Sequence, residues 1–121
     1  MRRRMMKSKI HRATVTGAEL DYAGSISLDT GLMALADIRE FEQVAVLDID
    51  NGNRFETYAI AGEAGQVQLN GAAARLVSPG HTVIVITYAD YDDAELDGAY
   101  APTVVLVDER NRVRSPALPG D

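Results

Sequence analysis

Gly24-Ser25 is the residue pair with the most distinctive chemical possibility in this chain. A serine hydroxyl can attack the carbonyl carbon before it, here that of Gly24, and convert the peptide bond into an ester. Elimination across Ser25 then gives dehydroalanine, which hydrolyses to a pyruvoyl group. Ordinary peptide bonds are planar and unreactive, so the reaction needs local strain, which a glycine without a Cβ tolerates, and a donor for the oxyanion. The ordinary interpretation is that the two residues only form a turn.

The segment 54–58 (Arg-Phe-Glu-Thr-Tyr) has the alternation of a strand. Arg54, Glu56 and Tyr58 then share one face, while Phe55 and Thr57 point the other way. An arginine can bind a carboxylate with two parallel hydrogen bonds, and a tyrosine can donate a proton. The ordinary alternative is a solvated strand face with a half-buried tyrosine.

Two further segments offer groups that bind anions. Lys9 and His11 alternate onto one face near the N-terminus and would form a positive patch on an otherwise acidic chain. Asn70-Gly-Ala-Ala-Ala74 offers free backbone N–H groups at the start of a helical turn, with Asn70 as the expected cap. A basic surface strand and an ordinary capped turn are the alternatives.

Many short strands must position these groups. Asn51-Gly52 is a strong hairpin signal, and Asp29 is a plausible N-cap for a short helix over residues 30–36. The pattern predicts a mainly β, small closed barrel formed by a single domain of residues 1–114, followed by a loose tail, 115–121. Strands are expected at residues 9–16, 25–28, 43–49, 54–60, 67–69, 81–88 and 103–107, with an acidic irregular segment at 90–98 that has room for one helical turn.

Composition excludes several classes of protein. The 121 residues carry a net charge of −6, which disfavours a nucleic-acid binder. Cysteine is absent, so disulfides and thiolate chemistry are excluded, and the two histidines lie too far apart in sequence to suggest a metal site. No apolar run is long enough to span a membrane, and the basic N-terminus lacks the apolar segment of a signal peptide. We therefore expect a cytoplasmic protein with no membrane and no nucleic-acid partner.

The ordered combination of these segments resembles the bacterial aspartate α-decarboxylases over nearly the whole chain. The motifs that carry the resemblance are residues 9–12 (KIHR), 22–25 (YAGS), 51–54 (NGNR), 57–60 (TYAI) and 70–74 (NGAAA). The resemblance implies a six-stranded double-psi β-barrel. It also implies a self-processing proenzyme that is cut between Gly24 and Ser25 and that feeds pantothenate synthesis as a homotetramer with active sites between subunits.

The resemblance also implies roles for individual residues. Ser25 becomes the pyruvoyl cofactor, with no metal, and Thr57 assists the cleavage. L-Aspartate forms a Schiff base with the pyruvoyl group and loses CO2, after which Tyr58 protonates the carbon to give β-alanine. The residues implied to bind substrate are Lys9, His11, Arg54, Thr57, Asn70, Gly71, Ala72 and Ala73.

Asp21, Arg75 and His81 depart from the family pattern, which leaves open the need for a maturation partner. Three other interpretations remain. The chain could be a related β-barrel module that never processes Ser25, a swapped-hairpin DNA-binding regulator, or a decarboxylase for another acidic amino acid such as glutamate.

Overall fold

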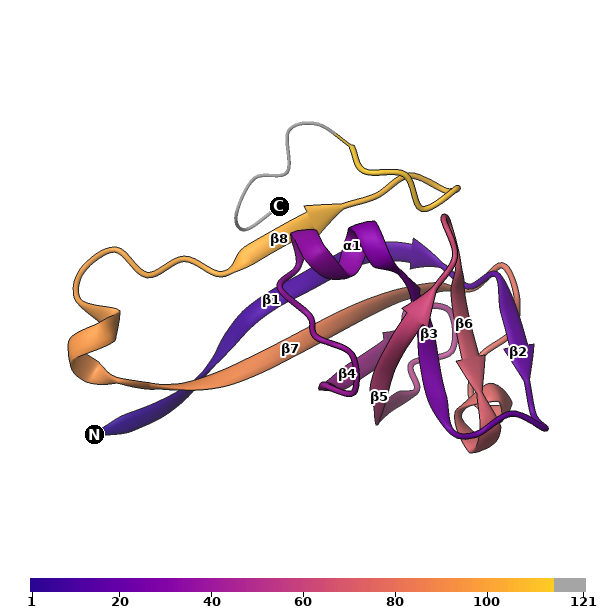
Figure 1. The fold of residues 1–121 in the computed structure, drawn as a ribbon, viewed down its shortest axis with the longest axis horizontal. Helices are drawn as coiled ribbons and strands as arrows, with labels where there is room; N and C mark the ends of the chain where they lie inside the picture. The colour runs from indigo at the N-terminus through magenta and orange to yellow at the C-terminus, as the bar shows by residue number, and fades with distance from the viewer. Residues whose placement is uncertain (115–121) are drawn as a thin grey trace.

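The chain forms one continuous eight-stranded sheet in the order β2-β6-β3-β5-β4-β7-β1-β8, seen in the computed structural model, which describes residues 1–114 (Figure 1). The elements are β1 (Arg2–Thr14), β2 (Gly17–Glu19), β3 (Ser25–Asp29), α1 (Thr30–Leu35), β4 (Gln43–Asp48), β5 (Arg54–Gly62), β6 (Val67–Asn70), the 3₁₀ helix η1 (Gly71–Arg75), β7 (Thr82–Asp92), the 3₁₀ helix η2 (Asp93–Leu96) and β8 (Thr103–Leu106). The mainly β class is confirmed. The expected loose tail, 115–121, lies outside the described residues.

The number of strands differs from the expected six. The resemblance implied six strands and the sheet has eight, of which the outermost two, β2 and β8, are only three and four residues long. Both pair in parallel, β2 with β6 and β8 with β1. The sequence pattern predicted seven of the eight strands, β8 at 103–107 among them, and did not predict β2.

Hydrogen bonds just after β1 connect the chain both to the start of its neighbour β7 and to the distant strand β6. Val15 N–H donates to the His81 carbonyl at 2.9 Å, and Thr16 N–H donates to the Val67 carbonyl at 2.7 Å. The first bond extends the β1–β7 pairing, whereas β6 lies far from β1 in the strand order, so the second bond brings the sheet round toward closure, as a small barrel requires. The interior is filled by fully buried aliphatic side chains, the largest of which are Ile10, Ile26, Leu28, Leu32, Leu69, Val15, Val44, Val46, Val67, Val83 and Val85.

Two local predictions are confirmed. The β4–β5 hairpin turns at Asn51-Gly52, where Gly52 has φ +78°, a region that glycine enters without a steric penalty. Asp29 caps α1, because its Oδ1 accepts hydrogen bonds from Gly31 N–H at 2.7 Å and Leu32 N–H at 3.2 Å.

Strands β1 and β7 extend further than the sequence pattern indicated. They pair antiparallel from Arg2–Asp92 to Thr14–Thr82 and form a long arm that projects away from β2, β3, β5 and β6 (Figure 1). The segment 90–98, expected to be irregular, thus contains the last residues of β7 followed by η2. Exposed ion pairs join Arg3 to Asp93 and Arg4 to Asp90 along this arm.

Candidate active site

Ser25 is the first residue of β3 and is 1% exposed. Its hydroxyl donates to the Ala23 carbonyl at 3.1 Å and accepts a hydrogen bond from Asn70 Nδ2 at 2.9 Å. Ser25 and Asn70 are directly paired across the antiparallel β3–β6 ladder. A buried serine with both a donor and an acceptor partner is held in one orientation beside its own peptide bond.

Asn70 does not cap η1, contrary to the sequence-based expectation. Its side chain makes no capping bond, and its amide donates instead to Ser25 and to the hydroxyl of Ser27 at 3.0 Å. Its Oδ1 accepts from Gln68 Nε2 at 2.9 Å. Two hydroxyls across the ladder give the buried Asn70 side chain more hydrogen bonds than a single capping bond to η1 would. The register of β3 against β6 therefore decides which partners Asn70 takes.

The crowded glycine at this site is Gly71 and not Gly24. A Cβ built on Gly71, which has φ +66°, would lie 2.7 Å from Gly24 Cα and 3.1 Å from the Tyr22 carbonyl oxygen. A Cβ on Gly24 would meet nothing within 4 Å, so no contact in this structure requires a glycine there. The close approach of η1 to the cleavage pair instead requires a glycine at position 71.

Thr57 and Tyr58 lie on β5, next to β3 in the sheet. The parallel register pairs Ile26 with Ala59. Counting back along both strands reaches Ser25 and Tyr58, then Gly24 and Thr57, so both pairs lie at the same end of the strand pair. Along β5, exposed and partly buried residues alternate, which confirms that Arg54 and Tyr58 share the outward face.

Lys9 lies on the outward face, several strands away from Ser25. Its neighbour Ile10 is fully buried, and the register aligns Lys9, Ile86, Ala45 and Glu56 in one row across β1, β7, β4 and β5. At about 4.8 Å per strand, Lys9 is roughly 14 Å from Glu56 along the sheet. Within residues 1–114, no hydrogen bond or ion pair connects Lys9 to Ser25, Thr57 or Tyr58.

His11 lies two residues after Lys9 on β1, in a pocket that also includes Arg12, Asp108 and Arg114. Its Nδ1 is buried and has no hydrogen-bond partner among the described residues. Loss of solvent around the ring, reinforced by the positive charges of Lys9 and Arg12, lowers the pKa of His11 below its ordinary value. One chain therefore does not bring His11 to Ser25.

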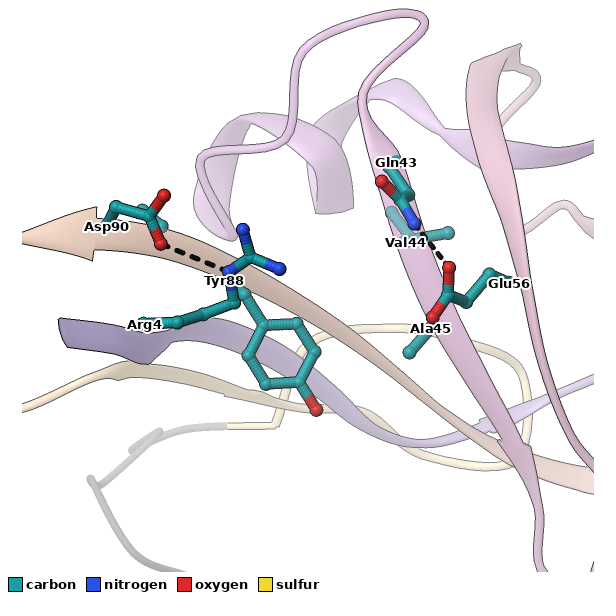
Figure 2. Close-up of a pocket in the computed structure, with 8 residues that line it drawn as sticks. Arg4, Gln43, Val44, Ala45, Glu56, Tyr88 and Asp90 are labelled. Carbon is teal, nitrogen blue, oxygen red and sulfur yellow. Dashed lines mark hydrogen bonds and ion pairs between the residues drawn. The ribbon is translucent and has the colours of Figure 1, made fainter.

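The outward face also carries a pocket between the β1–β7 arm and the β4–β5 hairpin. Figure 2 shows Arg4, Tyr88 and Asp90 on one side of it and Gln43, Ala45 and Glu56 on the other. Arg4 Nε pairs with Asp90 Oδ1 at 3.0 Å, and Gln43 donates to Glu56. Arg54 lines the adjoining hollow. Of the expected site residues, only Arg54 faces this pair of pockets.

Asp48, Asp50 and His81 form a compact group at the base of the β4–β5 turn, with ligand-type atoms within 4.8 Å of one another. Their polar atoms already have partners. His81 Nδ1 lies 2.7 Å from Asp48 Oδ2, Asp48 Oδ1 accepts from Asp50 N–H at 2.8 Å, and Asp50 Oδ2 accepts from Thr82 N–H at 2.7 Å. These hydrogen bonds connect the three residues to the β4–β5 turn and to the start of β7, which gives the group a structural role. His81, one of the departures from the family pattern, thus has a structural contact.

Sequence reasoning missed Ser27 and Gln68, which complete the hydrogen-bond network of Asn70. A signal for Ser27 was present, because residues two apart on a strand point the same way and Ser27 follows Ser25 by two.

No helix in the described part of the chain is long and apolar enough to cross a membrane.

Comparison with known proteins identifies the family. The aspartate decarboxylase family model matches residues 1–114. The aspartate 1-decarboxylase of Acetivibrio thermocellus is 58% identical over 111 residues, covering 90% of this chain and 87% of the relative. The aspartate 1-decarboxylase of Haloquadratum walsbyi is 55% identical over 113 residues, covering 93% of this chain and 96% of the relative. Most of both chains is aligned in each comparison, and the family match covers every described residue, so this chain belongs to the aspartate decarboxylase family.

Proposed function

We propose that this chain is a self-processing, pyruvoyl-dependent carboxy-lyase that converts L-aspartate to β-alanine and CO2 for pantothenate synthesis. It would be made as a single-domain proenzyme and cut between Gly24 and Ser25, in the cytoplasm. The observation that carries the proposal is the buried Ser25 hydroxyl, held 2.9 Å from the Asn70 amide and directly next to the exposed Gly24. Membership of the aspartate decarboxylase family supports the reaction.

The cleavage uses the chain's own atoms and one water. Ser25 Oγ bonds to the carbonyl carbon of Gly24 as the C–N bond breaks, which gives an ester. Loss of the Ser25 Cα proton and cleavage of the Cβ–O bond release the Gly24 carboxylate. Water then displaces ammonia from the remaining group and leaves a pyruvoyl group at position 25. Asn70 orients the attacking hydroxyl, and Thr57, two residues before the Ala59 that pairs with Ile26, assists the cleavage from β5.

The residues around Ser25 fit a pyruvoyl group. Ser25 is buried, its neighbour Asn70 offers an amide donor, and the Gly71 backbone lies against Gly24. The group, once formed, accepts the electron pair left behind by the departing CO2. Tyr58 is 37% exposed on the neighbouring strand and serves as the proton donor to the substrate carbon. Its position next to Ser25 in the register supports that role.

Substrate is bound from two directions. Arg54 is exposed at the start of β5 and offers a guanidinium to one substrate carboxylate. Backbone groups of Gly71, Ala72 and Ala73 in η1, together with Asn70, contact the remainder. These residues lie next to the cleavage pair because η1 follows β6 directly.

Lys9 and His11 complete the substrate site from a second copy of the chain. Both lie on β1, which is separated from β3 by β7, β4 and β5 in the strand order. A homotetramer with sites between subunits would bring a cation from one copy to the Ser25 of another. Mixing two inactive variants, Lys9→Ala and Tyr58→Phe, tests this directly. Activity should return in co-expressed mixed oligomers, and no recovery would contradict shared sites.

An intact-mass measurement under denaturing conditions tests the proposed cleavage. We expect one fragment of residues 1–24 and one of residues 25–121 that is lighter than its serine form by one ammonia. Ser25→Ala should remain a single folded chain without β-alanine production. An uncut, inactive wild-type chain after prolonged incubation with a cell extract, which would supply any maturation partner, would favour the non-catalytic module instead.

A further inference from the structure

The β4–β5 turn and η1 are joined through a single carbonyl group. Asn51 Nδ2 and Asn53 Nδ2 each donate a hydrogen bond to the main-chain oxygen of Leu76, both at 2.9 Å. Leu76 is the C-terminal cap of η1, and carbonyls at the end of a helix have no partner within it. Two side chains from one turn therefore satisfy the same helix-end acceptor.

The turn holds both amides in place. The buried Asp48 carboxylate accepts from Asp50 N–H at 2.8 Å and from Asn51 N–H at 3.3 Å. Asn51 Oδ1 in turn accepts from Asn53 N–H at 2.8 Å. The two donors thus belong to a pre-formed turn, and the next residue along the chain is Arg54.

The opposite end of η1 is attached to the cleavage site. Asn70, which precedes the helix, donates to the Ser25 hydroxyl, and the Gly71 backbone lies against Gly24. The 3₁₀ helix is therefore tied at its start to the reacting residue and at its end to the turn that presents Arg54. Each connection is a direct hydrogen bond of 2.9 Å, from Asn70 to Ser25 at one end and from the two asparagines to Leu76 at the other.

We propose that Asn51 and Asn53 are specificity-determining positioning residues, which fix the span between Arg54 and the η1 backbone and so select a substrate of aspartate length. This inference rests on the proposed function, in which Arg54 binds one carboxylate while η1 binds the rest of the amino acid. A fixed span disfavours glutamate, whose side chain is one methylene longer. If the distance between Arg54 and η1 can increase, glutamate also fits. One methylene then gives only a small difference in kcat/KM between the two substrates.

Substitution of both donors tests the inference. Asn51→Ala loses the donor to Leu76 together with the oxygen that accepts from Asn53 N–H, and Asn53→Ala loses the donor alone. Each single variant retains one bond to Leu76, so its ratio of kcat/KM for L-aspartate over L-glutamate should stay within about threefold of wild type. The double variant should lower that ratio by about tenfold, within the range that one methylene provides.

Two further variants make the test decisive. Asn53→Asp places a carboxylate against the Leu76 carbonyl and should also lower the ratio, through repulsion, without a second substitution. Asn111→Ala lowers stability at a distance from η1 and should leave the ratio unchanged, which separates a specific effect from general destabilisation. Mass spectrometry confirms complete cleavage of each sample before assay.

The outcomes distinguish the inference from the proposed function. A wild-type enzyme that prefers aspartate, with the same preference in both the double variant and Asn53→Asp, would overturn the positioning role. A ratio that falls equally in Asn111→Ala would overturn it as well. A cleaved wild-type protein that does not decarboxylate aspartate would overturn the proposed function itself.

Discussion

Replacement of Asn70 by alanine provides the sharpest test of the cleavage site. The change removes three hydrogen bonds, two donated to Ser25 and Ser27 and one accepted from Gln68. Ser25 keeps its bond to the Ala23 carbonyl, and the partly exposed Gln68 can turn toward water. The main loss falls on the two buried hydroxyls, so the free energy of unfolding should fall by about 2–3 kcal/mol.

The same substitution should slow cleavage. Asn70 orients the attacking oxygen, and one net hydrogen bond is worth about 1–1.5 kcal/mol. At 1.36 kcal/mol per factor of ten, self-cleavage of Asn70→Ala should be about tenfold slower than that of wild type. The rate is measured from the fraction of uncut chain at successive times after synthesis, by intact mass.

Ser27→Ala is the matched control, because it removes one of the Asn70 bonds without changing the contacts of Ser25. We expect it to lower the free energy of unfolding by about 1 kcal/mol and to leave the cleavage rate within about twofold of wild type. A folded Asn70→Ala protein that is cut at the wild-type rate would refute the role assigned to this amide.

Three other perturbations have defined outcomes. Tyr58→Phe should be cut normally but show kcat lowered by about 10²–10⁴-fold with little change in KM in a β-alanine assay, and wild-type turnover would remove Tyr58 as the proton donor. Asn111→Ala loses bonds to Thr14 N–H at 2.7 Å, the Thr14 carbonyl at 2.8 Å and the Gly65 carbonyl at 3.0 Å. Denaturant unfolding should show a loss of about 2–3 kcal/mol, and an unchanged midpoint would contradict the importance of this contact. Because the folded pKa of His11 is lowered, the unfolded chain binds its proton more readily, so the stability due to neutral His11 is present above the unfolded pKa of about 6.5 and is lost as the pH falls below it. His11→Gln should therefore lose less stability than wild type between about pH 7 and pH 5, and parallel curves for the two proteins would argue against this shift.

Local signals predicted the parts of the fold that depend on neighbouring residues. Asn51-Gly52 supplies the backbone freedom that a tight hairpin needs. Asp29 stands immediately before α1, and its carboxylate can accept hydrogen bonds from the first free N–H groups of that helix. Both features are decided within a few residues along the chain. Their chemistry is therefore visible in the sequence before any long-range contact is known.

Features that depend on strand register were not predictable in the same way. Asn70 had a local option, the cap of η1, and a cross-strand option, the hydroxyls of Ser25 and Ser27. Only the pairing of β3 with β6 shows that the second is available. Likewise, the Leu76 carbonyl that accepts from Asn51 and Asn53 is more than twenty residues away in sequence.

The sequence contained a signal for the long β1–β7 arm that was not considered when strands were predicted from the alternation of apolar and polar residues. Arg4 faces Asp90 across the ladder, and Arg3 pairs with Asp93 just beyond the end of β7, so a basic run near the N-terminus complements an acidic run at 90–93. Each pair is exposed, and exposed ion pairs contribute little to stability. Charge complementarity here selects the register more than it stabilises the arm, because like charges placed opposite each other would oppose the pairing.

Sites shared between copies would also account for the exposed aromatic groups at this end of the sheet. Phe41 is 71% exposed and has φ +73°, an unusual conformation for a bulky residue, yet its ring lies 6.4 Å from that of Tyr58. Tyr22, beside the cleavage pair, is 53% exposed. Burial within one chain gives no reason for three aromatic side chains here. A second copy that supplies Lys9 would cover them and exclude water from the reacting carbon, so the cation and the apolar cover would come from the same contact.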